Sequence, residues 1–338
     1  MRTIPTALLP ASLLTLAACT TAPTELPPLS VTAVAETEPV GTAAQDAADD
    51  PAIWRNAADP AGSLIVATDK KAGLYVYGLD GRTRSFVDGG LLNNVDLVDM
   101  DAAGIIVVAS DRNDLAAAQL QIYRLDPASA SLTLLGKVPA GAGEGYGLCL
   151  HRSGEQLLAY SVLKHGLVQE LRLTLSAAPT TEPLRQLTVA TQAEGCVVDP
   201  LDGTLYVGEE DAGIWRFAPG TTQGELVAPI DNRQLVADVE GLALLREGDR
   251  AWLVASSQGD NSYAVFALPE MTPLGRFNIA QGAFGSAEET DGIELAGGSF
   301  GSDLPDGLFI AQDGQNAPHA QNFKLVSWAA IKAALGIQ

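Results

Sequence analysis

The 338 residues are enough for one large domain or two small ones, and 47% of them are hydrophobic, so the chain can build a sizeable core. Acidic residues outnumber basic ones 41 to 20, which gives a formal net charge of −21. Because phosphate backbones are bound by basic surfaces, this charge argues against a nucleic-acid partner. Such acidity is typical of a role in solubility or in cation binding.

The first 19 residues have the features of a lipoprotein signal peptide. Arg2 is followed by an apolar run over residues 4–16, which ends in the lipobox-like sequence Leu16-Ala17-Ala18-Cys19. We expect Cys19 to become the lipidated first residue of an exported protein, which is anchored to the bacterial cell envelope (outer membrane or periplasm) or secreted. An ordinary signal peptide with an incidental cysteine is the alternative. The run is too short to span a membrane as a mature helix, so the anchor would be the sole membrane contact.

Residues 20–45 are rich in Thr, Pro, Ala and Glu, a composition that predicts a flexible tether before a folded domain over residues 46–338. Two cysteines remain in that domain, Cys149 and Cys196. An exported protein can pair them in a disulfide, but both lie in apolar strand-like segments, where free cysteine packs as a small hydrophobic residue. The sequence slightly favours the unpaired state.

One pattern recurs six times after residue 45: an apolar strand that ends in a small residue, a polar turn, and a second strand. The apolar strands are Leu64–Thr68, Ile105–Ser110, Leu157–Ser161, Leu205–Glu209, Trp252–Ser256 and Leu308–Gln312. Equivalent positions in consecutive copies are 42, 51, 48, 47 and 56 residues apart. Periods of this length, with short strands and glycine-rich turns, are typical of β-propellers, so we predict an all-β fold with six blades. A β-sandwich is the alternative, which the recurrence in register disfavours.

Each copy also has an earlier short strand, which in a propeller lines the central channel. The starts of these strands would form a ring at one mouth, made of Asp50, Asn94, Tyr146, Glu194, Glu240 and Asp291. Four carboxylates in one ring repel one another and become tolerable when hard cations lie among them. Ca²⁺ accepts about six to eight oxygen ligands, and the low histidine count argues against softer metals. The sequence therefore predicts several bound Ca²⁺ ions; solvated acids at strand starts are the alternative.

Basic residues follow the apolar strand at matched positions in three consecutive copies. They are Lys70 and Lys71 in the first copy, Arg112 in the second and Lys164 in the third. Cationic side chains beside metal-bound carboxylates suit a phosphate ligand, whereas ordinary exposed turn charge is the alternative. Since no residue has the context of a phosphoryl-transfer nucleophile, we expect no covalent intermediate.

Taken in order, these segments resemble the β-propeller phytases, which are calcium-dependent alkaline phytases with six blades. The resemblance extends over about residues 45–332. The segments that carry it are Asp49–Trp54, Lys70–Leu74, Asn93–Asp96, Glu209–Trp215, Asp238–Leu242, Ser256–Tyr263, Thr290–Ile293, Ala311–Gly314 and Gln321–Lys324. No single motif decides the matter, but the ordered set is highly specific.

The resemblance implies hydrolysis of phosphate monoesters of myo-inositol hexakisphosphate (phytate), presented as its calcium complex and attacked directly by a calcium-activated water. It implies calcium ligands at Asp49, Tyr146, Glu194, Glu210, Glu240 and Asp291, with Asp50, Asp238 and Asp313 as further acids in calcium or structural roles. It implies phosphate-binding bases at Lys70, Arg112 and Lys164, beside Lys71. The expected catalytic set is therefore Lys70, Arg112, Tyr146, Lys164, Glu194, Glu210 and Glu240.

Two other classes of protein remain open from the sequence. One is a lipid-anchored propeller that acts as a scaffold or binding protein, since propellers host many functions. The other is a lactonase-type propeller hydrolase, which would use one calcium ion. Neither requires the three matched bases. We expect a monomer, because propellers expose only short, protected strand edges.

Overall fold

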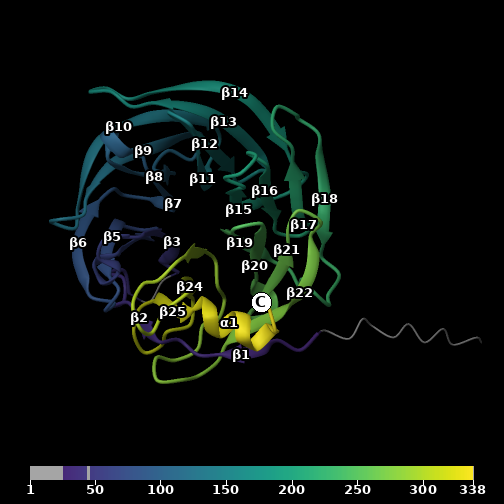
Figure 1. Ribbon diagram of the computed structural model, residues 1–338. Helices are drawn as coiled ribbons and strands as arrows, with labels where there is room; N and C mark the ends of the chain where they lie inside the picture. Colours follow the sequence, from purple (N-terminus) through teal and green to yellow (C-terminus); the bar gives the residue numbers. More distant parts are fainter. Residues whose placement is uncertain (1–25, 44–45, 338) are drawn as a thin grey trace, which may run out of the picture.

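Antiparallel sheets in the structure are arranged radially around one axis (Figure 1), which confirms the prediction of an all-β, six-bladed propeller. The computed structural model describes residues 26–43 and 46–337. Five blades are built from four strands that follow one another in the chain, and the sixth borrows its outer strand from the N-terminal segment. The predicted signal peptide and Cys19 lie outside the described residues.

The blades follow the order of the chain, and each runs from an inner strand at the axis to an outer strand at the rim. Blade one contains β3 (Ala48–Trp54), β4 (Leu64–Asp69), β5 (Gly73–Gly78) and β6 (Thr83–Asp88); blade two contains β7 (Leu92–Asp99), β8 (Ile105–Asp111), β9 (Ala117–Asp126) and β10 (Ser131–Ala142); blade three contains β11 (Gly145–Ser153), β12 (Gln156–Leu163), β13 (Leu167–Thr174) and β14 (Thr180–Thr188). Blade four contains β15 (Ala193–Val198), β16 (Leu205–Glu209), β17 (Gly213–Phe217) and β18 (Gly224–Pro229); blade five contains β19 (Val239–Glu247), β20 (Arg250–Ser257), β21 (Ser262–Ala267) and β22 (Thr272–Ile279); blade six contains β23 (Ile293–Gly297), β24 (Gly307–Asp313) and β25 (Asn322–Ser327).

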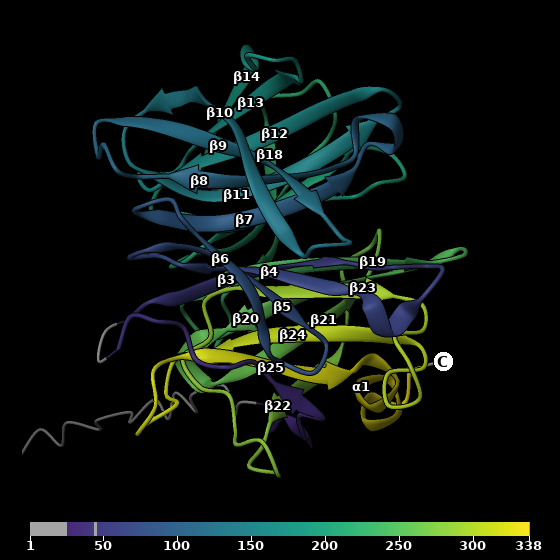
Figure 2. The same ribbon diagram turned by 90° about the vertical axis from the view of Figure 1, so that its left-hand side faces the viewer.

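The second strand of each blade is buried along its whole length or nearly so, because it faces a neighbouring blade on both sides. This explains why these strands read as continuous apolar runs in the sequence rather than as alternating ones. Outer strands such as β6 alternate between half-buried and exposed residues. The core is accordingly divided into layers between neighbouring blades. Figure 2 shows the arrangement of the blades from the side.

The N-terminal segment closes the ring, which corrects the predicted domain start at residue 46. Strand β1 (Leu29–Val31) pairs in parallel with β22 of blade five, and β2 (Ala35–Glu36) pairs antiparallel with β25 as the outer strand of blade six. Glu36 accepts a bond of 2.5 Å from the buried ammonium group of Lys324. The composition of the N-terminal segment resembles that of a linker. Its strands β1 and β2 nevertheless pair with strand edges that would otherwise lack a hydrogen-bonding partner.

The chain ends in helix α1 (Trp328–Leu335), which places Trp328 and Ile331 in the core layer shared by blades five and six. Gly336 ends the helix in the left-handed conformation, with φ of 68°. Three short 3₁₀ turns complete the elements: η1 (Pro60–Gly62), η2 (Asp101–Ala103) and η3 (Gln258–Asp260). Within the described part of the chain, no helix is both long enough and apolar enough to cross a membrane.

Candidate metal and phosphate site

A β-bulge near the start of the inner strand of blades one to five sets the position of the site. In each of these blades two residues of the inner strand lie opposite one residue of the second strand. The first bulge residues, together with Asp291 before β23, form an inner ring: Asp49, Asn93, Tyr146, Glu194, Glu240 and Asp291. The predicted ring is therefore correct in blades three to six and shifted by one residue in blades one and two.

The second bulge residue packs against the main chain of the next blade. A Cβ at Gly147 would lie 1.8 Å from the carbonyl oxygen of Glu194, and one at Gly195 would lie 2.1 Å from that of Glu240. Glycine is therefore required for this close approach. Blade one instead has Asp50, whose carboxylate accepts a bond of 3.1 Å from the main-chain N–H of Val95.

Asp50 consequently faces a different space from Asp49. It lines a small axial cavity of about 70 Å³ together with Asn94, Asp96 and Glu294. Burial, followed by the charge of Asp49, raises the pKa of Asp50 well above its ordinary range. The structure thus separates Asp50 from the inner ring with which the sequence grouped it.

A second ring of equivalent positions surrounds the first. The residue after the second strand donates its main-chain N–H to the carbonyl two positions before the inner-ring residue; these residues are Lys70, Arg112, Lys164, Glu210 and Gln258. We call this set the outer ring. The three predicted bases therefore do occupy matched positions, and Glu210 is the member from blade four.

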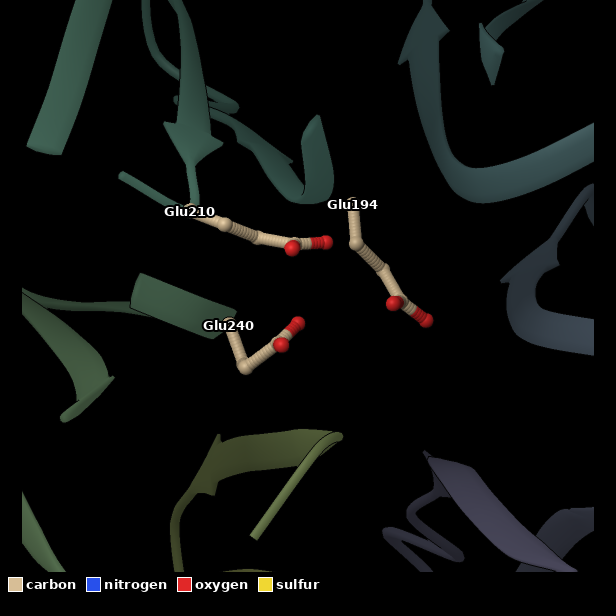
Figure 3. A group of neighbouring side chains, drawn as sticks. All are labelled: Glu194, Glu210 and Glu240. Atoms are coloured by element: carbon tan, nitrogen blue, oxygen red, sulfur yellow. The ribbon is translucent and has the colours of Figure 1, made fainter. Parts of the chain in front are cut away.

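Three carboxylates form the densest part of the site. Glu194 and Glu240 from the inner ring and Glu210 from the outer ring are all buried, and each offers an oxygen within 4.8 Å of the other two (Figure 3). Burial is the largest cause that raises the pKa of Glu194 and Glu240 well above the ordinary range, and neighbouring acids add to it. Burial also raises the pKa of Glu210. The ionised forms of these three carboxylates repel one another, and burial makes those ionised forms less stable.

The donor set fits calcium. All three side chains offer hard oxygen ligands, and oxygens bound to one Ca²⁺ at about 2.3–2.6 Å lie no more than about 5 Å apart. Oxygen Oε2 of Glu240 is buried and has no hydrogen-bond partner, so it is free to bind a cation. The residues present therefore match the group that the sequence predicted.

Lys70 acts as the counter-charge on the other side of the ring. Its buried ammonium group lies 2.7 Å from Asp49, 2.9 Å from Asp291 and 2.9 Å from Asp46. Burial lowers the pKa of Lys70, but these three carboxylates outweigh it and raise the pKa. Burial, followed by the charge of Asp49, raises the pKa of Asp291 to about 7.

The other bases lie beside the mouth with weaker partners. The guanidinium of Arg112 is 3.4 Å from Glu144, and the ammonium of Lys164 is 4.9 Å from the ring centroid of Tyr146. Lys71 is half-buried in the turn next to Lys70. These groups therefore remain able to exchange their present contacts for a phosphate oxygen.

Neutral amides, which the sequence reasoning did not single out, hold the acids in place. Gln192 donates to Glu210 at 2.7 Å and to the hydroxyl of Tyr146 at 3.3 Å. Gln258 donates to Asp291 at 2.7 Å. Their signal in the sequence is positional, since Gln258 belongs to the outer ring and Gln192 lies two residues before an inner-ring acid.

Two further predicted acids lie outside this cluster. Asp313 is buried beside Lys324, at 3.2 Å, and accepts the main-chain N–H groups of Glu288 and Gln315. Asp238 is half-buried, and burial, followed by the charge of Asp211, raises its pKa. The contacts of Asp313 are those of a structural residue. Asp238 lies two residues before Glu240, and its charge contributes to the raised pKa of that residue.

Two cavities help to delimit the site. One of about 440 Å³ opens beside Asp46, Gln258 and Asp291, next to the rings. A larger one of about 540 Å³ lies between blades two and three, where Arg152 and Arg172 are already paired with Asp101 and Glu182. The smaller cavity is lined by Asp46 and Asp291, the two acids that each lie 2.9 Å from Lys70, so it adjoins the Lys70 side of the rings.

The predicted unpaired state of the two cysteines is wrong. Cys149 on β11 and Cys196 on β15 form a disulfide, with their Cα atoms 5.7 Å apart. Neighbouring inner strands bring them together at the axis, a proximity that a sequence separation of 47 residues does not reveal.

A six-bladed propeller whose mouth combines buried acids with matched bases has the features of a hydrolase of phosphate esters. The phytase family model matches residues 2–338. The chain is 34% identical over 327 residues to a 3-phytase of Bacillus subtilis (strain 168), which covers 90% of this chain and 85% of that relative. The chain therefore belongs to the phytase family and is a phosphoric monoester hydrolase, as the resemblance implied. The scaffold and the lactonase are thereby disfavoured.

One solved structure provides a more distant comparison. Sqt1 of Chaetomium thermophilum, bound to the N-terminus of the ribosomal protein L10, is similar with a TM-score of 0.46 and 13% identity, over 81% of this chain and 74% of that one. At this level the likeness has no bearing on function.

Proposed function

We propose that the protein is a calcium-dependent phytase that cleaves phosphate monoesters of phytate at the mouth defined by the two rings. The observation that carries this proposal is the buried group of Glu194, Glu210 and Glu240, which lies on one propeller mouth with three bases at matched positions. Acids alone would suit a calcium-binding protein. Acids with bases suit a calcium phosphate ligand.

Calcium, when bound, would neutralise the carboxylates, attract phosphate oxygens and make water a better nucleophile. The chain supplies the rest of the site. The side chains of Lys70, Arg112 and Lys164 would donate charge-assisted hydrogen bonds to the phosphoryl oxygens and stabilise the charge that develops there. The described site residues include no serine, cysteine or histidine placed as a nucleophile, so we propose direct attack by water without a phosphoenzyme.

The net charge of −21 explains why the cation is needed before the substrate binds. Phytate is a polyanion, and the ionised acids of the inner ring repel it. The carboxylates bind cations only when ionised, and their pKa values are raised. Activity should therefore favour neutral to alkaline pH.

Phosphate release tests the proposal. The full chain is stripped with a chelator and incubated with sodium phytate, with and without added Ca²⁺, and inorganic phosphate is measured. We expect release only with Ca²⁺ and recovery after the metal is added back. Equal phosphate release in excess chelator would refute the calcium requirement. No phosphate release under either condition would refute the proposal that phytate is the substrate.

We further propose that the protein is exported and lipid-anchored through Cys19. The support is the lipobox-like sequence that ends in Cys19, after an apolar run too short to span a membrane. A Cys19→Ala variant expressed in a bacterial host should move from the membrane fraction to the soluble fraction and lose incorporation of labelled palmitate. An unchanged membrane fraction would refute the anchor.

A further inference from the structure

Blade two is the one blade whose inner-ring residue has had no role in the site. Its residue is Asn93, at the same bulge position as the acids of blades one and four, Asp49 and Glu194. The sequence reasoning placed the neighbouring Asn94 in the ring, and the bulge register exchanges the two. The side chain of Asn93 is only 1% exposed, so its contacts belong to the site and not to solvent.

The amide of Asn93 bridges two acids from different blades. Its nitrogen lies 2.6 Å from Glu194 Oε1 and 3.2 Å from Asp49 Oδ2. The neighbouring amide of Asn94 is satisfied when its own nitrogen faces Glu194 Oε1, at 2.9 Å, and the carbonyl oxygen of Tyr146, at 3.0 Å. The two amide hydrogens of Asn93 thus face two carboxylates, which carry negative charge once ionised.

The other half of the amide is unsatisfied. Oxygen Oδ1 of Asn93 is buried and has no hydrogen-bond partner. A buried amide oxygen without a partner destabilises the folded state, so a bound ligand at this atom would remove that cost. Oxygen Oε2 of Glu240, in the neighbouring acid group, is in the same condition. Two unpartnered buried oxygens therefore belong to the same ring.

We propose that the side-chain oxygen of Asn93 is a calcium ligand shared with Asp49 and Glu194, an inference that rests on the proposed calcium-dependent function. Rotation of the amide about its last side-chain bond exchanges nitrogen and oxygen. In the orientation that the structure shows, the N–H groups bridge the two carboxylates. In the loaded ring the oxygen faces the cation between them, and blade two contributes a neutral ligand that adds no further repulsion.

Calcium binding by the full chain, measured by calorimetry and by the calcium-dependent rise in melting temperature, tests this assignment. Asn93→Ala removes the oxygen, and we expect calcium affinity to fall by at least about tenfold, the scale of losses at metal sites. Asn93→Asp retains an oxygen at the same place, so calcium should bind at least as tightly as in the wild type. Wild-type affinity in Asn93→Ala would overturn the proposal.

Asn322 provides a matched control. It is also 1% exposed, its nitrogen bridges Glu36 and the carbonyl of Thr37, and its Oδ1 is likewise buried and unpartnered, but it lies on β25 at the outer part of blade six. Asn322→Ala should lower the melting temperature without changing calcium affinity. If it weakens calcium binding as much as Asn93→Ala does, the effect is general destabilisation and the assignment fails.

A calcium-loaded crystal structure provides a second measurement that needs no variant. We expect Asn93 Oδ1 at about 2.3–2.6 Å from a cation. A cation bound by Asp49 and Glu194 while Asn93 still donates its N–H groups to them would overturn the proposal. Failure of the wild type to bind calcium at all would instead refute the proposed function, so the two failures are distinguishable.

Discussion

Glu194 connects the buried acid group to the amide of blade two. It belongs to the buried group with Glu210 and Glu240, and it accepts the amide of Asn93 at 2.6 Å. Its pKa is raised first by burial and then by the charge of Asp49. A neutral side chain at this position would leave the acid group with one negative charge fewer for binding a cation.

Glu194→Gln should therefore keep the fold and lose most of its activity. We expect phosphate release from phytate at saturating Ca²⁺ to fall by about 100-fold or more, as when a charged group is removed from a preorganised site. Glu225→Gln is the matched control, since Glu225 forms an exposed ion pair with Arg216 on the outer strand of blade four. A rate for Glu194→Gln equal to that of the control would remove Glu194 from the site.

Much of the site at this scale could be predicted from the sequence. Tyr146, Glu194, Glu240 and Asp291 do form a ring, and Lys70, Arg112 and Lys164 do occupy matched positions. Blades one and two each carry two polar residues in succession at this point. A β-bulge determines which of the two enters the ring, so the spacing in the sequence alone could not identify it. The roles of Gln192 and Gln258 were not predicted, because a pattern of charged residues gives no information about neutral donors.

At the scale of elements, two neighbouring inner strands are joined covalently. The disulfide between Cys149 and Cys196 connects β11 to β15, the strands that begin near Tyr146 and Glu194. A crosslink over 47 residues restricts the unfolded chain. The sequence could not reveal it, because the pairing depends on which inner strands are neighbours at the axis.

Removing the disulfide should lower stability. For the double variant Cys149→Ala/Cys196→Ala we expect the free energy of unfolding to fall by about 2–4 kcal/mol, measured by denaturant unfolding with calcium present. Addition of a thiol reductant should destabilise the wild type to the same level and leave the double variant unchanged. Identical unfolding midpoints for the oxidised wild type and the double variant would contradict this prediction.

The axial acids of the inner strands give the fold a pH dependence of its own. Burial raises the pKa of Asp96 to about 7, and burial followed by the charge of Asp96 raises the pKa of Glu294 to about 8. Asp50 faces the same cavity, and its pKa is also raised. The folded state therefore binds these protons more tightly than the unfolded state, whose carboxyl groups titrate near pH 4.

Stability in chelator should accordingly be highest at acid pH and fall as the pH rises from about 5 through 8. Glu294→Gln fixes a neutral side chain at one position, so it should reduce that fall by more than about 1 kcal/mol, since each pKa unit corresponds to about 1.4 kcal/mol. Thermal unfolding at a series of pH values measures the slope, with Glu225→Gln as the control. A slope in Glu294→Gln as steep as in the control would show that Glu294 is not protonated in the folded state.

At the scale of the whole molecule, the propeller brings together residues that are far apart in the chain. The six-fold repeat in the sequence predicted this architecture, because each copy carries the same pattern of strands and turns. The N-terminal strands β1 and β2 could not be predicted, since they are short and lie in a segment with the composition of a linker. Their structure comes from pairing with blades five and six.

Calcium should stabilise the whole propeller, because a ligand that binds only the folded state shifts the unfolding equilibrium. Glu194, Glu210 and Glu240 come from three different strand ends, so a cation among them joins blades four and five. We expect chelation to lower the melting temperature at pH 8 and added Ca²⁺ to restore it. Magnesium at the same concentration is the control and should restore less, because it requires a more rigid octahedral site.

The central claim is that acids from separate blades converge to hold calcium at one mouth. A crystal structure of the calcium-loaded protein, with the anomalous signal of the metal recorded, tests it most directly. We predict cation density within about 2.3–2.6 Å of oxygens from Glu194, Glu210 and Glu240. A protein that shows phytase activity in the same calcium solution, yet has no cation density at these three side chains, would contradict the account.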